Sequence, residues 1–165
     1  MAGTATIFIL GYGATLSAGT TSGASGTPIG QLKSISYSGD QASYANVTNL
    51  SSPPAAAGGP PVEEFAPTTI TPSTATITGI LNPAGDAGQE LISSSFATQT
   101  LLYFTHQFAP AVIAGVAQTT GAKRTFAGYV SKKPVMNSQL QDAVGFDFEV
   151  KITGVITDTP GTAGA

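Results

Sequence analysis

The chain has 165 residues, a length that suits one domain with a buried core. Only 9% of the residues are charged, against roughly 25% in a typical domain, and the net charge is −3. This low and negative charge argues against a protein that binds nucleic acid through a basic face. The absence of cysteine excludes disulfides and thiolate metal sites. A surface so poor in charge promotes association, so we expect much of it to contact other copies.

The N-terminal part predicts two strands separated by a loop. Residues 4–10 are expected to form a buried strand, and no basic residue precedes Lys33, so the apolar run Ile7–Leu10 lacks the leader of a signal peptide. Residues 11–28 are rich in Gly, Ser and Thr and predict a loop, and residues 29–37 predict a second strand. No run approaches the roughly 18 apolar residues of a membrane span, so membrane insertion is not expected.

The segment 38–73 shows no regular pattern. It contains Pro53-Pro54 and Pro60-Pro61, which exclude a helix or a central strand at those positions. A loop of this length in a compact domain is usually functional or disordered. We therefore expect a long extended loop, or arm, over about residues 38–73.

One helix is expected. Residues 74–81 alternate between apolar and threonine positions and predict a half-buried strand. Asn82-Pro83 then resembles a helix start, with Asn as the cap, Pro in the first turn, and Asp86 and Glu90 near the positive end of the helix dipole. The apolar spacing that follows predicts a helix over about residues 84–98.

Four more strands are predicted, near residues 100–108, 111–118, 124–133 and 143–157. In the last of them five apolar residues alternate with polar ones and define a buried face: Val144, Phe146, Phe148, Val150 and Ile152. Gly154 is expected to shift the register. The fold class is thus mainly β, an antiparallel β-sandwich or open barrel with one flanking α-helix, in a single domain over 1–157 with a flexible tail over 158–165.

The residues needed for catalysis are scarce. The single histidine, His106, falls on the apolar side of its predicted strand and is interpreted as a core or edge residue. Asp147 and Glu149 share a strand face about 7 Å apart, which leaves an acid pair or a calcium site open, but Lys151 on the same face favours a solvated strip of mixed charge. We expect no enzyme, and no catalytic, cofactor-binding or metal-binding residues.

Three stretches, in this order and spacing, resemble the major tail tube proteins of long-tailed (siphovirus-type) bacteriophages. The first is NVTNLSSP at residues 46–53 followed by EEFAP at 63–67. The second is TITGILNP at 76–83 running into DAGQ at 86–89, and the third is TFAGYV at 125–130 with the closing strand 144–156. The resemblance extends from about residue 11 to residue 157, and departs from the family at the Ala/Gly/Pro insert between Ser52 and Glu63.

This resemblance implies a structural subunit of the virion. Family members have a β-sandwich with a flanking helix, and form stacked, usually hexameric rings around a tape-measure protein. DNA passes through the lumen without specific binding, and tail terminator and tail-tip proteins are the other expected partners. The implied location is the phage tail, assembled in the host cytoplasm, with no cofactor.

The same resemblance nominates site residues. The expected contacts between subunits involve eight residues of the predicted long loop: Asn46, Val47, Thr48, Asn49, Leu50, Glu63, Glu64 and Phe65. The alternation of the closing strand, and not the resemblance, places Asp147 and Glu149 on its polar face, which is expected to face the lumen or the outer surface of the tube.

Two other functions stay open from the sequence. The first is another phage structural β protein, such as a minor tail or head-decoration subunit, which differs in assembly geometry. The second is an extracellular β-sandwich that binds carbohydrate or acts as an adhesin, although such modules use exposed aromatic residues for sugar stacking and this chain has no tryptophan.

Overall fold

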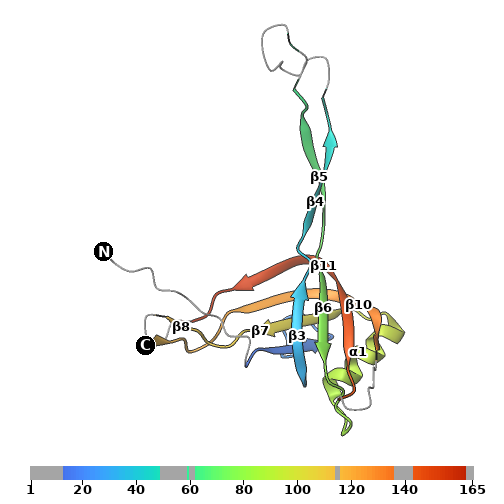
Figure 1. The fold of residues 1–165 in the computed structure, drawn as a ribbon, viewed down its shortest axis with the longest axis vertical. Coiled ribbons are helices and arrows are strands. Elements are labelled where there is room, and N and C mark those ends of the chain that lie inside the picture. The colour runs from blue at the N-terminus through green and yellow to red at the C-terminus, as the bar shows by residue number, and fades with distance from the viewer. Residues whose placement is uncertain (1–12, 49–58, 60–61, 114–115, 136–142, 163–165) are drawn as a thin grey trace.

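The body is built on one seven-stranded antiparallel sheet, with strand order β2-β1-β7-β10-β11-β6-β3 (Figure 1). The computed structural model describes residues 13–48, 59, 62–113, 116–135 and 143–162, so the strand predicted over 4–10 lies outside the described residues. The sheet strands are β1 (Thr15–Gly19), β2 (Thr27–Ile29), β3 (Leu32–Tyr37), β6 (Thr74–Gly79), β7 (Leu102–Gln107), β10 (Lys123–Val135) and β11 (Asp147–Thr159). This confirms the predicted class, a mainly antiparallel β fold with one helix.

One face of this sheet carries the core, because buried residues are direct partners on neighbouring strands. Phe126 on β10 lies opposite Phe104 on β7, with ring centroids 5.1 Å apart. Farther along the sheet, Val150 on β11 lies between Val130 and Ala75. All five are at most 4% exposed. Such cross-strand pairs are the units that stabilise a sheet.

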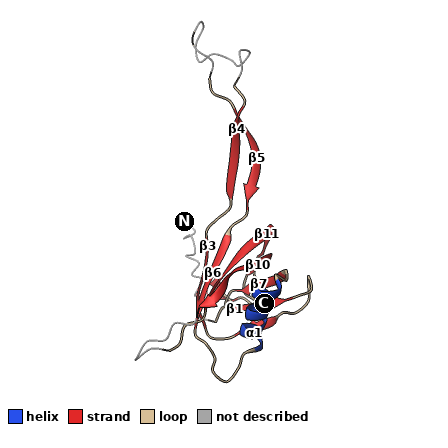
Figure 2. Cartoon of the chain, turned by 90° about the vertical axis from the view of Figure 1, so that its right-hand side faces the viewer, coloured by secondary structure: helices blue, strands red, loops and turns tan. Residues whose placement is uncertain are grey.

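The sheet curls so that its edge strand β3 approaches the inner strands β10 and β7 across the core. Tyr37, on the edge strand β3, packs edge-on against Phe126 of β10 with centroids 5.8 Å apart, although two strands lie between them in the sheet. Its hydroxyl also reaches His106 of β7, at 2.9 Å. These contacts make the body an open barrel rather than a flat sheet (Figure 2).

The closing strand β11 confirms the predicted alternation. Phe146, just before it, and Phe148, Val150 and Ile152 within it are at most 2% exposed, and the residues between them are not buried. Gly154 has a φ of +78°, and the register against β10 shifts there, as the sequence predicts.

Helix α1 spans Ala87–Thr98 and packs on β10, β2 and β1. It begins three residues later than predicted, because Asp86 and not Asn82 is the N-cap: its Oδ1 accepts a hydrogen bond from the backbone N–H of Gln89 at 2.9 Å. Its Oδ2 also accepts from the N–H of Gly30, at 3.2 Å, and so ties the helix start to the turn between β2 and β3.

The buried side chain of Gln89 fixes the helix further. Its Nε2 donates to the carbonyls of Gly30 and Ile80, at 3.2 and 2.8 Å, and its Oε1 accepts from the N–H of Asn82 at 3.1 Å. At the neighbouring Gly88, a Cβ would collide with the backbone of Pro28. The first turn of α1 is therefore held against the sheet by satisfied polar contacts and a close backbone approach.

Three other segments differ from the prediction. The expected loop 11–28 contains β1 and the first two residues of β2. The expected strand 111–118 is a short hairpin of β8 (Val112–Ile113) and β9 (Val116–Ala117). In the expected flexible tail, β11 continues to Thr159, and the backbone of Thr162 exchanges hydrogen bonds with residues 119 and 120.

The segment 38–73, expected to lack regular structure, contains a two-stranded antiparallel hairpin of β4 (Gln41–Asn46) and β5 (Phe65–Thr71). Both views show it projecting away from the body (Figures 1 and 2). All of β4 is exposed, as is all of β5 except Ala66. We call the described part of this hairpin, residues 41–48 and 62–71, the arm.

Candidate functional site

Five of the eight predicted interface residues come together at the far end of the arm. The N–H of Val47 donates to the carbonyl of Glu64 at 2.8 Å, and the N–H of Glu64 donates to Oγ1 of Thr48 at 2.7 Å. The side chain of Asn46 accepts from the N–H of Thr48 at 2.9 Å, and Asn46 pairs with Phe65 across the hairpin. Residues that are sixteen or more positions apart in sequence thus form one surface.

The other three predicted residues are Asn49, Leu50 and Glu63. Asn49 and Leu50 lie outside the described residues, and Glu63 is exposed next to Glu64. Glu63 and Glu64 are the only charged residues of the arm, which therefore carries a negative end and no cation.

One face of the arm is apolar, and this face was not predicted. The pairing register places Ala42 opposite Ile70 and Tyr44 opposite Pro67, on the same side as Phe65. Ile70, Tyr44 and Phe65 are 70%, 62% and 58% exposed. The opposite face carries small and polar side chains, from Gln41, Ser43, Thr69 and Thr71 among others.

An isolated two-stranded hairpin is at best marginally stable in water, because one strand pair buries too little apolar surface. In this chain the apolar face of the arm has no cover from the described residues, since its large side chains are exposed. Exposed apolar surface of this kind marks interaction sites. The arm is therefore the strongest candidate for a functional surface.

The root of the arm is fixed to the body by hydrogen bonds. The N–H of Ser38 donates to the carbonyl of Thr74, and the N–H of Thr74 donates back to Oγ of Ser38, at 3.0 and 2.8 Å. Oδ1 of Asp40 accepts from the N–H of Ser73 at 2.8 Å, and the carbonyl of Ser73 accepts from Ile152 of β11. These contacts fix the point from which the arm leaves the sheet.

The predicted acidic pair lies on the sheet face opposite the core. Asp147 and Glu149 are half-buried and alternate with the buried Phe146, Phe148 and Val150. In the register, Glu149 lies between Lys132 of β10 and Thr76 of β6. Glu149 thus sits between polar residues on the outer face of the sheet, whereas Asp147 pairs with Val135.

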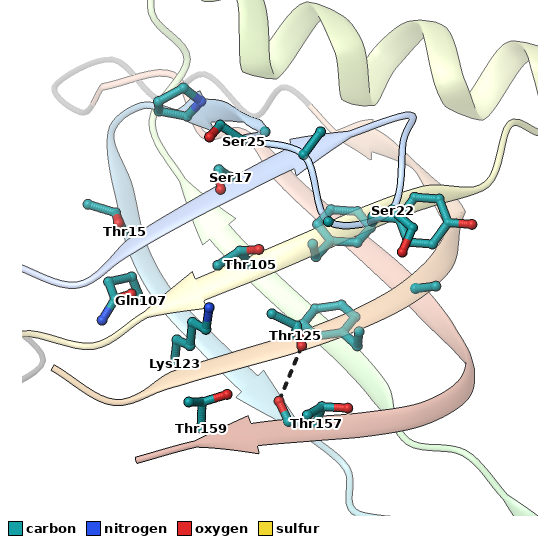
Figure 3. Close-up of a pocket in the computed structure, with 18 of the residues that line it drawn as sticks. Thr15, Ser17, Ser22, Ser25, Thr105, Gln107, Lys123, Thr125, Thr157 and Thr159 are labelled. Carbon is teal, nitrogen blue, oxygen red and sulfur yellow. Dashed lines mark hydrogen bonds between the residues drawn. The ribbon is translucent and has the colours of Figure 1, made fainter. Parts of the chain in front are cut away.

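A shallow groove of about 820 Å³ lies on the same outer face, over four neighbouring strands. Figure 3 shows its side chains projecting from β1, β7, β10 and β11, among them Ser17, Thr105, Thr125 and Thr157. The loop after β1, with Ser22 and Ser25, forms one rim. Sequence reasoning missed this surface, because its residues come from four segments that only the sheet brings together.

The groove is uncharged except for Lys123. Lys123 makes no ion pair with any residue that the structure describes. Val155, at the bulge in β11, also lines the groove and is 85% exposed. The groove thus offers hydroxyl, methyl, amide and aromatic groups, with one cation.

A polar cluster runs from the buried His106 to the exposed Asp158 beside the root of the arm. His106, 6% exposed, accepts or donates a hydrogen bond at Nδ1 to the hydroxyl of Tyr37 at 2.9 Å, and its ring lies 4.2 Å from that of Phe108. Arg124 lies over the Tyr37 ring at 4.8 Å and forms two hydrogen bonds of 2.7 Å with the carboxylate of Asp158. The predicted placement of His106 on the buried side of its strand is confirmed.

The surroundings shift the pKa of each group in this cluster. Burial, and then the nearby positive charge of Arg124, lower the pKa of His106 below 6.5. Burial raises the pKa of the Tyr37 hydroxyl to about 12, so that the hydroxyl stays protonated at neutral pH. The hydrogen bond from Arg124 lowers the pKa of Asp158.

Acidification is expected to destabilise the body through His106. The unfolded chain binds a proton near pH 6.5 and the folded chain does so at a lower pH, so the free energy of unfolding falls as pH falls from about 6.5. Between pH 7.5 and 5.5 the free energy of unfolding falls by at most about 1.4 kcal/mol, because the unfolded chain takes up one more proton than the folded chain over the one pH unit below 6.5. Urea unfolding of the wild type and of His106→Gln at both values measures it; equal pH dependence of the two proteins would contradict it.

The described residues contain no group of three or more His, Asp or Glu side chains placed to hold a metal ion. Among them there is also no helix long and apolar enough to cross a membrane.

Comparison of folds gives the clearest relationships. No protein-family model matches the chain, and no curated protein matches it in sequence. A chain of the SPP1 tail tube superposes with a TM-score of 0.61 and 12% identity, covering 93% of this chain and 80% of its own length.

Two chains from gene transfer agent particles are similar to the same degree. One, from the virion of the native particle, superposes with a TM-score of 0.60 and 12% identity, covering 91% of this chain and 98% of its own length. The other, from the tail of the empty particle with C6 symmetry, has a TM-score of 0.58 and 13% identity, and covers 88% and 94%. The chain therefore has the fold found in the SPP1 tail tube and in the tail of the gene transfer agent particle.

Proposed function

We propose that this chain is the structural subunit of a phage tail tube, in which copies form hexameric rings that stack around a tape-measure protein and leave a conduit for DNA. The observation that carries the proposal is the fold, shared over 93% of this chain with a chain of the SPP1 tail tube. The C6 symmetry of the tail of the empty gene transfer agent particle supports rings of six.

The surface chemistry fits this function. A tube grows by heterologous contacts, in which one surface binds a different surface of the next copy and the series stays open along the axis. An arm with an uncovered apolar face supplies the first of these surfaces. The predicted interface residues at its far end, Asn46 to Thr48 and Glu64 to Phe65, belong to this contact.

The charge also suits a conduit for DNA. Six copies at −3 each give a ring about −18, a field that keeps phosphate away from the wall. Asp147 and Glu149, on the outer face of the sheet, contribute to it from the lumen or from the outside of the tube.

Negative-stain electron microscopy of the purified protein tests the proposal. We expect hollow rods, or rings at low concentration, with sixfold symmetry in end-on views. A minor tail or head-decoration subunit would give neither, so particles that stay globular and monomeric at every concentration would overturn the proposal.

A further inference from the structure

The arm and the outer-face groove are complementary, and we propose that the arm of one copy docks in the groove of the next. The inference rests on the proposed function and adds the surface that receives the arm. It starts from two observations: the arm has an uncovered apolar face, and the groove is an open surface on the body.

The occupant of the groove is a second copy, because the chain's own arm cannot reach it. Both views show the arm projecting away from the sheet body that carries the groove (Figures 1 and 2). Hydrogen bonds from Ser38 and Asp40 fix the root of the arm in that direction. One copy therefore offers an arm and an empty groove at the same time, which is the requirement for a heterologous contact.

The dimensions of the two surfaces match. The groove extends over four neighbouring strands, which at about 4.8 Å per strand spacing span about 14 Å. The arm is a ribbon of two strands whose backbones are about 5 Å apart. The ribbon therefore fits within the groove with room for the side chains of its apolar face.

The chemistry of the surfaces also matches. Apart from Lys123 the groove presents no charge. Placing Tyr44, Phe65 and Ile70 against it therefore removes water from threonine and serine hydroxyls, which costs much less free energy than removing water from ions. Val155 adds an exposed apolar side chain at the same place.

Charge complementarity sets the orientation of the arm. The groove has one cation, Lys123, and no carboxylate, whereas the arm has two carboxylates, Glu63 and Glu64, and no cation. Docking with the far end of the arm beside Lys123 pairs opposite charges. Complementary charges of this kind select the register of an interface and reject alternatives.

Engineered disulfides test the docking directly, because the chain has no cysteine of its own. A full-length chain carrying Tyr44→Cys is mixed with a chain of different mass carrying Thr105→Cys or Thr157→Cys, and the mixture is oxidised under assembly conditions. We expect a disulfide-linked heterodimer for a groove cysteine. The matched control carries Ser94→Cys, on the exposed face of α1, and should give no heterodimer.

The charge pair gives a second measurement. Lys123→Glu is expected to lower the yield of tubes by about tenfold or more, and the additional change Glu63→Lys is expected to restore it. Lys133→Glu, an exposed lysine outside the groove, is the control and should leave the yield unchanged.

The outcomes separate the two proposals. Tubes in the microscope without cross-linking above the Ser94 control overturn the docking and leave the tube assignment intact. A heterodimer without tubes supports the docking and overturns the tube. Absence of both overturns both.

Discussion

Replacing Phe148 by alanine is expected to lower the free energy of unfolding by roughly 3–5 kcal/mol. The ring is 1% exposed, packs against Phe146 at 5.7 Å, and lies opposite Ile77 of β6. Alanine would leave a cavity in this part of the core. Because a domain is stable by only about 5–15 kcal/mol, the variant should be largely insoluble or fail to assemble.

Urea unfolding followed by circular dichroism measures this loss on the soluble fraction. Phe65→Ala is the matched control: it removes the same side chain from the exposed face of the arm, and should change the free energy of unfolding by no more than about 0.5 kcal/mol. If Phe148→Ala unfolded at the same urea concentration as the wild type, the ring would not fill the core.

The body could be predicted where local pattern and burial agree. Strand β11 alternates apolar and polar residues over its first half, and the sheet buries the residues that the alternation selects, from Phe148 to Ile152. A strand with one face on the core needs such a pattern, so the pattern alone identified it. The bulge at Gly154 was also readable, because glycine adopts the positive φ found there.

The helix was predicted, but its start was not. Asn82-Pro83 and Asp86 are both acceptable starts by local chemistry. The structure selects Asp86 because its second carboxylate oxygen reaches Gly30, which lies 56 positions earlier in the chain. A tertiary contact of this kind leaves no signal in the local sequence.

Strand β1 was missed for a related reason. Leu16 and Ala18 are fully buried, but they stand in a segment rich in Gly, Ser and Thr that reads as a loop. Their burial comes from pairing with β2 on one side and with β7 on the other. Two apolar residues are too few to predict a strand without that context.

The arm shows a similar limit. Its apolar face follows a period of two along β4, with Ala42 and Tyr44, but on β5 the alternation is broken by a bulge between Pro67 and Thr69. Proline is tolerated there because β5 is an edge strand. The residues expected to contact other subunits were found through resemblance, whereas Tyr44 and Ile70 emerged only from the register.

Replacing residues 46–66 by a short Gly-Ser linker is expected to abolish tube formation while the body stays folded. None of the described residues in that range is buried, so the variant removes no core contact. The linker joins Ala45 to Pro67, which are held close because Tyr44 pairs with Pro67. The variant loses Phe65, the acidic end and the hydrogen bond from Val47 to Glu64, and with them the surface proposed to bind the next copy.

Circular dichroism and urea unfolding establish that the body is intact, and negative-stain microscopy counts the tubes. The control replaces only residues 53–61, within the Ala/Gly/Pro-rich stretch between Ser52 and Glu63, and keeps the end of the arm from Asn46 to Thr48 with Glu64 and Phe65. We expect that control to form tubes like the wild type, because the paired residues and both acids remain. Normal tubes from the 46–66 variant would show that the arm is not the connector, and its apolar face would then need another partner.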